Sequence, residues 1–202
     1  MFELFGEIRF KIMKNLVLSC KPKNKFICDL GAGNPSISDG IDCKKIIKID
    51  INTKSEPDII CDLTKGISLS NKSVDICIAG EILEHIYNSK EFISAIKVVL
   101  KSNGYLILSC PNICSLKYRI AFLLGKIPAH AAKADCQYQD KKIGHLRDYN
   151  FGEVEKLLKM FNFNIIEKKS DGVSFNGKTI LPRYFLPKTF GDSIIIKAKI
   201  MR

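Results

Sequence analysis

The residues best suited to bind a ligand are a glycine pair and an aspartate that follow two short apolar runs. Phe26–Leu30 leads into Gly31-Ala32-Gly33, and the run 46–49 leads into Asp50. Glycine permits a sharp turn and lets a ligand approach bare main-chain amides. An acid at the end of the neighbouring strand can accept hydrogen bonds from ribose hydroxyls. Together these features predict a nucleoside site at the carboxyl edge of a parallel sheet, although each alone also fits a tight turn or a helix cap.

The elements that must position these residues follow from the pattern of apolar residues. Apolar runs bounded by Gly, Pro, Asn, Asp or Ser predict strands at 26–30, 46–49, 58–61, 74–79, 105–110, 164–168 and 193–200. Helical spacing is found in 4–17, 81–101, 116–124 and 151–161, and Asn150 is a plausible cap for the last of these. Strands that alternate with helices indicate βαβ units and a mostly parallel sheet.

Length and composition fit one globular domain that can bury a substantial core. The chain has 202 residues, of which 46% are hydrophobic and 26% charged. No apolar run approaches the roughly eighteen residues of a membrane span, and charged residues interrupt the first fourteen positions, unlike a signal peptide. The sequence therefore predicts a soluble, cytoplasmic protein with no transmembrane segment.

The net charge of +11 is spread along the chain. Its lysines occur in blocks no longer than two, and no arginine-rich or aromatic-interleaved basic segment is present. A diffuse excess of lysine is typical of a solvated surface, and it also favours an anionic partner. RNA or an acidic glycan stays open as a partner, with nucleic acid not favoured.

The eight cysteines indicate neither disulfides nor a metal site. Cys28, Cys61, Cys77 and Cys110 lie in predicted strands, where a free thiol behaves as a small buried hydrophobe. The sequence has no Cys-x-x-Cys pair, and Cys114 has no second pair with which to complete a zinc site. We therefore expect reduced thiols and no bound metal.

Several of these segments resemble the motifs of class I S-adenosylmethionine-dependent methyltransferases. The segment 26–36 resembles the first motif of that family, and 46–52 resembles its acidic second motif. Cys61-Asp62-Leu63 is similar to the adenine-side segment, 73–100 resembles the strand and helix that carry a Leu-Glu-His signature, and 101–106 resembles the turn that opens the fifth strand. The resemblance covers most of 26–112, and the combination is far more specific than any single motif.

The resemblance implies an α/β, Rossmann-like fold with a mostly parallel seven-stranded sheet, helices on both faces and an antiparallel last strand. One methyltransferase domain would fill 1–202, with a lead-in helix in 1–21, a cofactor-binding half in 22–112 and an acceptor-side part in 113–202. Gly31 and Gly33 would pack against the methionine part of S-adenosylmethionine, Asp29 would help bind its ammonium, Asp50 would hold the ribose, and Asp62 would meet the adenine. The full cofactor-binding set implied is Asp29, Gly31, Ala32, Gly33, Asp50, Ile51, Asp62, Leu63, Glu81 and Ile82.

The acceptor side is predicted from 144–149, which resembles segments in the ubiquinone-biosynthesis-like and glycan-modifying branches of the family. His145 is the candidate general base, because an unperturbed histidine titrates near neutral pH, or it orders its loop. His85, Arg147 and Tyr149 are the candidate substrate-binding residues. His85 could instead orient neighbouring groups, and Arg147 could instead pair with nearby acids. Residues 116–124 are either a lid or a packing helix.

Two departures from the family pattern bear on function. Pro35 replaces the third glycine of the first motif, and only 36–42 remain for the helix that normally follows, so that helix is short or missing. The predicted function is methyl transfer from S-adenosylmethionine to an oxygen or nitrogen of a small-molecule or glycan-type acceptor. The alternatives are an RNA-directed methyltransferase, an inactive S-adenosylmethionine-binding module and an NAD-dependent oxidoreductase, which the absent third glycine disfavours.

Overall fold

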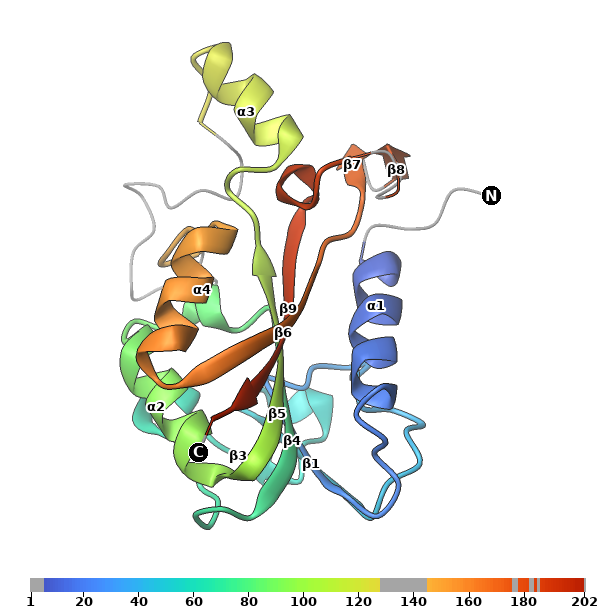
Figure 1. The fold of residues 1–202 in the computed structure, drawn as a ribbon, viewed down its shortest axis with the longest axis vertical. Helices are drawn as coiled ribbons and strands as arrows, with labels where there is room; N and C mark the ends of the chain where they lie inside the picture. Colours follow the sequence, from blue (N-terminus) through green and yellow to red (C-terminus); the bar gives the residue numbers. More distant parts are fainter. Residues whose placement is uncertain (1–5, 128–144, 176–177, 182–183, 185, 202) are drawn as a thin grey trace.

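The computed structural model describes residues 6–127, 145–175, 178–181, 184 and 186–201. Its centre is a seven-stranded sheet in the order β3-β2-β1-β4-β5-β9-β6 (Figure 1). The first five strands in this order pair in parallel, and β9 pairs antiparallel with both β5 and β6. The strands are β1 (Phe26–Leu30), β2 (Lys45–Asp50), β3 (Ile59–Ile60), β4 (Val74–Gly80), β5 (Leu100–Pro111), β6 (Phe163–Lys169) and β9 (Ser193–Ile200). The predicted fold class, with an antiparallel last strand, is confirmed.

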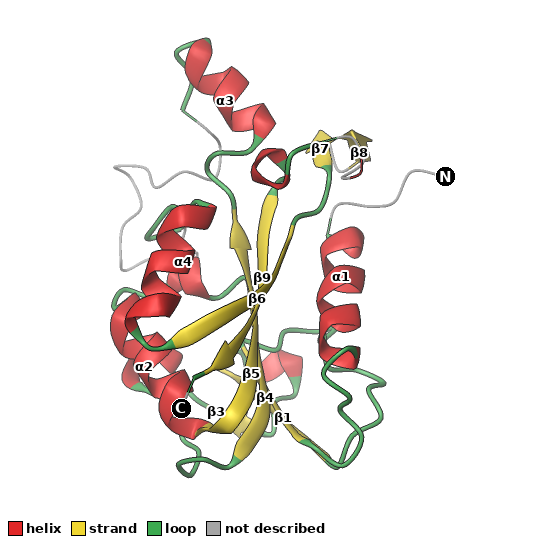
Figure 2. Ribbon diagram, in the orientation of Figure 1, coloured by secondary structure: helices red, strands yellow, loops and turns green. Residues whose placement is uncertain are grey.

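Helices cover both faces of the sheet, as Figure 2 shows. Helix α1 (Glu7–Leu18) lies on one face, and α2 (Ser89–Val99) and α4 (Phe151–Met160) lie on the other, while α3 (Leu116–Leu123) projects beyond the sheet. Asn150 caps α4 as predicted, because its side chain accepts a hydrogen bond from the main chain of Glu153. No helix within the described residues is long and apolar enough to cross a membrane.

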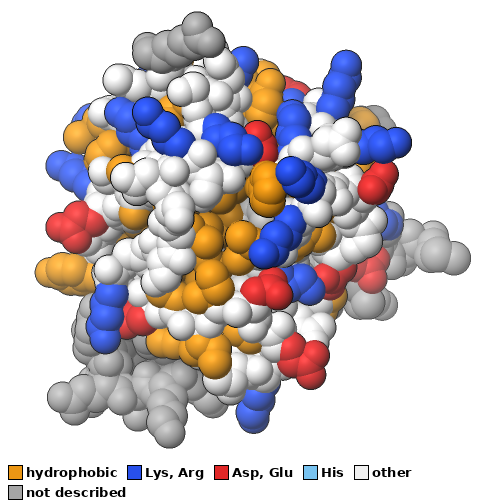
Figure 3. Space-filling model, turned by 90° about the horizontal axis from the view of Figure 1, so that it is seen from below, with side chains coloured by type: hydrophobic (Ala, Val, Ile, Leu, Met, Phe, Trp, Pro, Cys, Tyr) orange, Lys and Arg blue, Asp and Glu red, His pale blue; other side chains and the backbone are white. Residues whose placement is uncertain are grey.

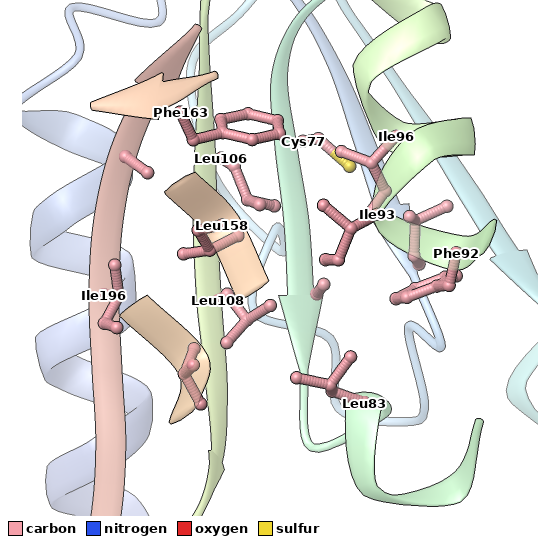
Figure 4. Close-up of a cluster of buried hydrophobic side chains, with 14 of the residues drawn as sticks. Cys77, Leu83, Phe92, Ile93, Ile96, Leu106, Leu108, Leu158, Phe163 and Ile196 are labelled. Atoms are coloured by element: carbon pink, nitrogen blue, oxygen red, sulfur yellow. The ribbon is translucent and has the colours of Figure 1, made fainter. Parts of the chain in front are cut away.

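The core has two layers because alternate residues of each buried strand face opposite sides. On β4, Ile76 and Ile78 pack with α1, whereas Cys77 and Ala79 pack with α2 and α4. Figure 4 shows the second layer, in which Cys77 and Leu106 face helix side chains such as Ile93. Seven cysteines, at 20, 28, 43, 61, 77, 110 and 114, are described, and all are free as expected.

The loop between β1 and β2 contains turns in place of a helix, so the expectation of a short or missing helix is confirmed in its stronger form. Hydrogen bonds to side chains explain why turns form here instead of a helix. The main-chain N–H of Ser36 donates to Asp39, and that of Ser38 donates to Asp29. Serine and aspartate side chains compete in this way with the hydrogen bonds of a helix.

The helical pattern predicted over 81–101 is divided in the structure. A short 3-10 helix, η3 (Leu83–His85), precedes α2, and β5 already begins at Leu100. Asn88 sets the division, since its side chain caps α2 by accepting from the N–H of Glu91. The prediction of one continuous helix containing His85 was therefore wrong.

The structure also adds a small hairpin that the sequence pattern did not reveal. β7 (Val173–Phe175) pairs antiparallel with β8 (Lys178–Leu181) between β6 and β9. Among the described residues, further 3-10 turns are η1 (Thr53–Ser55), η2 (Leu63–Lys65) and η5 (Lys188–Phe190). The predicted helical positions 4 and 5, and position 144 of the predicted acceptor-side segment, lie outside the described residues.

Candidate active site

The glycine loop after β1 has the conformation that its sequence predicts. Gly31 and Gly33 have φ angles of +66° and +60°, where residues with a Cβ are strained. A Cβ at Gly31 would lie 3.2 Å from Cδ1 of Ile82, whereas a Cβ at Gly33 would meet nothing within 4 Å. The loop therefore packs tightly on Ile82 at one glycine and leaves the other open to a ligand.

Asp50 joins the end of β2 to this loop. Its Oδ2 accepts a hydrogen bond of 2.9 Å from the N–H of Gly33, and its Oδ1 accepts one of 2.8 Å from the N–H of Asn52. An ionised carboxylate has about four acceptor positions, so two can still receive hydroxyl groups. The next side chain, Ile51, is 65% exposed and offers an apolar surface beside the acid.

Asp29 lies beneath the loop and is almost fully buried. Its Oδ2 accepts from Ser36 Oγ at 2.6 Å and from the N–H of Ser38 at 3.2 Å. Burial raises the pKa of this carboxyl to about 6, with the serine hydrogen bonds acting in the opposite direction. In this arrangement the Asp29 side chain contacts the loop's own serines.

Replacing Asp29 with asparagine is expected to change how stability depends on pH. A raised pKa means that the folded chain keeps this proton between about pH 4 and pH 6 while the unfolded chain loses it, so the free energy of unfolding falls over that range by about 3 kcal/mol. An asparagine oxygen can still accept from both serines. Urea unfolding at pH 4 and pH 7 should therefore show the variant gaining about 3 kcal/mol relative to the wild type. An unchanged difference at the two pH values would contradict this assignment.

Asp62 and Leu63 follow β3 on the other side of Asp50. The N–H of Cys61 donates to the Asp50 carbonyl at 3.0 Å, which places this segment against the end of β2. Asp62 Oδ1 accepts from the hydroxyl and the N–H of Thr64, and these bonds lower its pKa. Leu63 is buried. The predicted adenine-side residues thus lie beside the predicted ribose acid.

Glu81 directly follows β4 and has the left-handed conformation, with φ of +52°. Its Oε1 accepts a 2.9 Å hydrogen bond from Ser109 Oγ and lies 3.6 Å from a guanidinium nitrogen of Arg9. Burial raises the pKa of Glu81, and the charge of Arg9 opposes that change. Sequence reasoning missed Arg9, although it lies one helical turn before the buried Ile12 and so faces the sheet.

The two predicted acceptor-side histidines meet beside Glu84. The His85 and His145 rings form an edge-to-face pair with centroids 5.3 Å apart, and His85 Nε2 lies 3.9 Å from Glu84 Oε1. The N–H of Leu146 donates to the Glu84 carbonyl at 2.9 Å, which holds this segment on η3. Burial, together with the charge of the nearby Glu81, raises the pKa of the Glu84 carboxyl to about 8.

The other two predicted acceptor-side residues lie in a groove that does not include the histidines. Arg147 donates to the Tyr87 carbonyl at 2.9 and 3.2 Å, and the buried Tyr149 hydroxyl is hydrogen-bonded to Ser89 at 2.6 Å. Both residues line an open groove of about 570 Å³ together with Asn88, Ser89, Lys90, Glu153, Lys156, Leu157 and Met160. The structure therefore divides the predicted acceptor residues into two groups.

Comparisons with known proteins identify the family and the fold. The family model described as a hypothetical methyltransferase matches residues 9–131, and no curated protein sequence matches the chain. The solved structure of a Burkholderia thailandensis 1,6-didemethyltoxoflavin-N1-methyltransferase, with bound 1,6-didemethyltoxoflavin and S-adenosylhomocysteine, is 12% identical with a TM-score of 0.64, over 98% of this chain and 80% of that one.

Two further solved structures share the fold. A Mesorhizobium loti S-adenosylmethionine-dependent methyltransferase is 15% identical with a TM-score of 0.65, over 96% of this chain and 98% of that one. The Bradyrhizobium japonicum N-methyltransferase NodS, in complex with S-adenosylhomocysteine, is 12% identical with a TM-score of 0.63, over 99% and 89%. The chain therefore belongs to the hypothetical methyltransferase family and has the class I S-adenosylmethionine-dependent methyltransferase fold.

Proposed function

We propose that the protein moves a methyl group from S-adenosylmethionine to a nitrogen or oxygen atom of a small-molecule or glycan-type acceptor. The observation that carries this proposal is the 2.9 Å hydrogen bond between the N–H of Gly33 and the Asp50 carboxylate. It joins a glycine loop and an acid at adjacent strand ends, where nucleosides bind in open α/β sheets.

The residues at these strand ends fit the proposed cofactor. Space above Gly33 is open, and Asp50 keeps acceptor positions for two ribose hydroxyls. Beside them, Ile51 exposes an apolar surface that a purine ring would cover, and Asp62 with Leu63 would border the same ring. Glu81 adds a carboxylate near the loop, which is favourable for a ligand that carries positive charge.

S-adenosylmethionine supplies a methyl group on a sulfonium, which is already a good leaving group. The main work left to the protein is alignment of the acceptor with that methyl and exclusion of water. Ile82, packed on Gly31, and Ala32 would close the loop side of the site, while Arg9 holds Glu81 and Ser109 in place. The proposed role of Asp29 is to fix the loop through Ser36 and Ser38, beside its predicted role toward the ammonium.

An NAD-dependent oxidoreductase fits this structure poorly. Dinucleotide binding relies on a helix N-terminus after the first strand, which holds the pyrophosphate. Residues 31–44 are fully described and contain turns with no helix. An inactive binding module is the remaining alternative, and measurement of methyl transfer decides between it and an enzyme.

Small-molecule acceptors are proposed first because two of the similar solved structures are described as N-methyltransferases, one of them with its small substrate bound. The branch predicted from 144–149, ubiquinone-like or glycan-modifying, stays part of this proposal. RNA is the second candidate because of the charge of +11. Figure 3 shows Lys and Arg side chains scattered among apolar and uncharged atoms over one face of the molecule, without a single basic block.

The acceptor class can be tested by methyl transfer from labelled S-adenosylmethionine to a panel of small amines, hydroxylated aromatics, glycans and RNA. We expect transfer to a small molecule or glycan whose binding changes less than about threefold between 50 and 200 mM salt, because few phosphates are neutralised. RNA binding would instead weaken by about 10³-fold over that range. Transfer to RNA alone would contradict the proposed acceptor, and no transfer with intact cofactor binding would favour the inactive module.

A further inference from the structure

Three side chains of metal-ligand type converge at the end of the sheet, and the cofactor-binding role does not account for them. Glu84 and His85 are adjacent in η3, and His145 enters from the segment that leads to α4. One ligand atom from each side chain lies within 4.8 Å of the other two. Residues far apart in sequence thus present two imidazoles and a carboxylate to one point.

The carboxylate of Glu84 gives this cluster a second, independent feature. Its side chain is 2% exposed, and its Oε2 has no hydrogen-bond partner within the described part of the chain. A buried carboxylate oxygen is normally satisfied by a donor, a cation or a metal. The Glu81 carboxylate is close enough to add further negative charge. A positive ion bound by Glu84 would give its Oε2 a partner and offset the negative charge of the two carboxylates.

Hydrogen bonds to main-chain carbonyls hold the two parts of the cluster together without an ion. On the η3 side, the N–H of Leu146 donates to the Glu84 carbonyl at 2.9 Å. The next residue, Arg147, donates twice to the Tyr87 carbonyl. His145 is therefore placed beside η3 by its neighbours in sequence, as preorganised metal sites require.

We propose that Glu84, His85 and His145 form a binding site for a divalent transition-metal cation. Two imidazole nitrogens and one carboxylate oxygen suit Zn²⁺, Co²⁺ or Ni²⁺ better than Ca²⁺ or Mg²⁺, which prefer oxygen ligands. Ligand atoms of a tetrahedral site are about 3.4 Å apart, so modest side-chain rotation closes the present spacing. Three protein ligands leave a position for water or another oxygen ligand.

In this assignment His145 is a ligand, and the ring nitrogen that binds the cation cannot serve as a general base. The proposal does not depend on methyl transfer, because the cation would bind in the absence of S-adenosylmethionine. It differs from the expectation of no bound metal, which rested on the spacing of the cysteines. The relevant signal in the sequence was the adjacent pair Glu84-His85, whose third partner lies sixty residues away.

The test is titration of Co²⁺, Zn²⁺ and Mg²⁺ into chelator-treated, cofactor-free protein, followed by calorimetry and by the visible spectrum of the Co²⁺ form. We expect one equivalent of Co²⁺ or Zn²⁺ to bind, with Mg²⁺ at least tenfold weaker. E84Q and H145A should each weaken Co²⁺ binding by tenfold or more. E153Q, which alters an exposed glutamate in α4, should bind like the wild type.

Two controls keep the proposal open to refutation. Because E84Q replaces a buried carboxyl with an amide of nearly the same shape, it should fold, and thermal unfolding without metal verifies this. Bound Co²⁺ should raise the unfolding temperature of the wild type and of E153Q but not of E84Q. The proposal is overturned if one equivalent of metal does not bind, or if E84Q and H145A bind Co²⁺ as tightly as the wild type. A thiolate charge-transfer band, which would assign the ion to cysteine, would also overturn it. S-adenosylhomocysteine affinity is measured separately, so failure of the cofactor proposal is distinguishable.

Discussion

Replacing Asp50 with alanine is expected to weaken S-adenosylhomocysteine binding by about 100-fold or more. Each hydrogen bond to a charged acceptor contributes about 1.5–3 kcal/mol, and the carboxylate is proposed to receive two ribose hydroxyls. The substitution also removes the acceptor for the N–H of Gly33. Isothermal calorimetry on the folded variant measures the loss.

Two further variants test whether the loss of affinity comes from the ribose contacts of Asp50, from its bond to Gly33 or from the removal of any nearby acid. Asp58→Ala removes another acid near the same sheet edge, one that accepts from the N–H of Lys48, and its affinity should stay within about threefold of the wild type because that bond is solvent-exposed. Asp50→Asn keeps an oxygen for Gly33 and should lose affinity mainly through the ribose contacts. Wild-type affinity in folded Asp50→Ala would show that the nucleoside lies elsewhere.

The largest effect on stability is expected from Gly191→Ala. A Cβ at this position would overlap Ser170 Oγ and the main-chain oxygen of Asp171. Ser170 Oγ is itself bonded to the Ser193 carbonyl at 2.7 Å, and Asn112 donates to the Gly191 carbonyl at 2.8 Å, so neither side can move freely. Overpacking together with a lost hydrogen bond should lower the free energy of unfolding by about 3 kcal/mol.

Thermal unfolding checks this value, since a loss of that size lowers the midpoint of a 202-residue protein by about 6–12 °C. Gly152→Ala is the matched control, because Gly152 lies in α4 and its Cβ would meet only Asn150 Oδ1, at 3.3 Å. That variant should stay within about 1 kcal/mol of the wild type. A midpoint for Gly191→Ala equal to that of Gly152→Ala would mean that the segment around 191 relaxes easily.

The sequence predicts the sheet well because its strands are short apolar runs with clear boundaries. The run 26–30, for instance, coincides with β1. The pattern failed where side chains compete with main-chain hydrogen bonds. Asn88 divided a predicted helix by capping α2, and Ser36 and Ser38 stabilised turns after β1. Such competition is decided by local geometry that periodicity does not carry.

The candidate site was predictable from the sequence only where the order of the strands brings its residues together. Gly33 follows β1 and Asp50 ends β2, and these strands pair in parallel, so the meeting of the two residues follows from the order of the sheet. Arg9 reaches Glu81 from the lead-in helix, and no spacing rule predicts how α1 docks on the sheet. The meeting of His85 with His145 likewise depends on how 145–147 is held on η3.

The most direct test of the account is calorimetric titration of the purified wild-type protein with S-adenosylhomocysteine and, in parallel, with NAD. We expect one molecule of S-adenosylhomocysteine to bind per chain with micromolar or tighter affinity, and NAD to give no measurable heat of binding. Tighter binding of NAD, or no binding of S-adenosylhomocysteine to verified folded protein, would contradict the assignment of the glycine loop and Asp50 to an adenosyl sulfonium ligand.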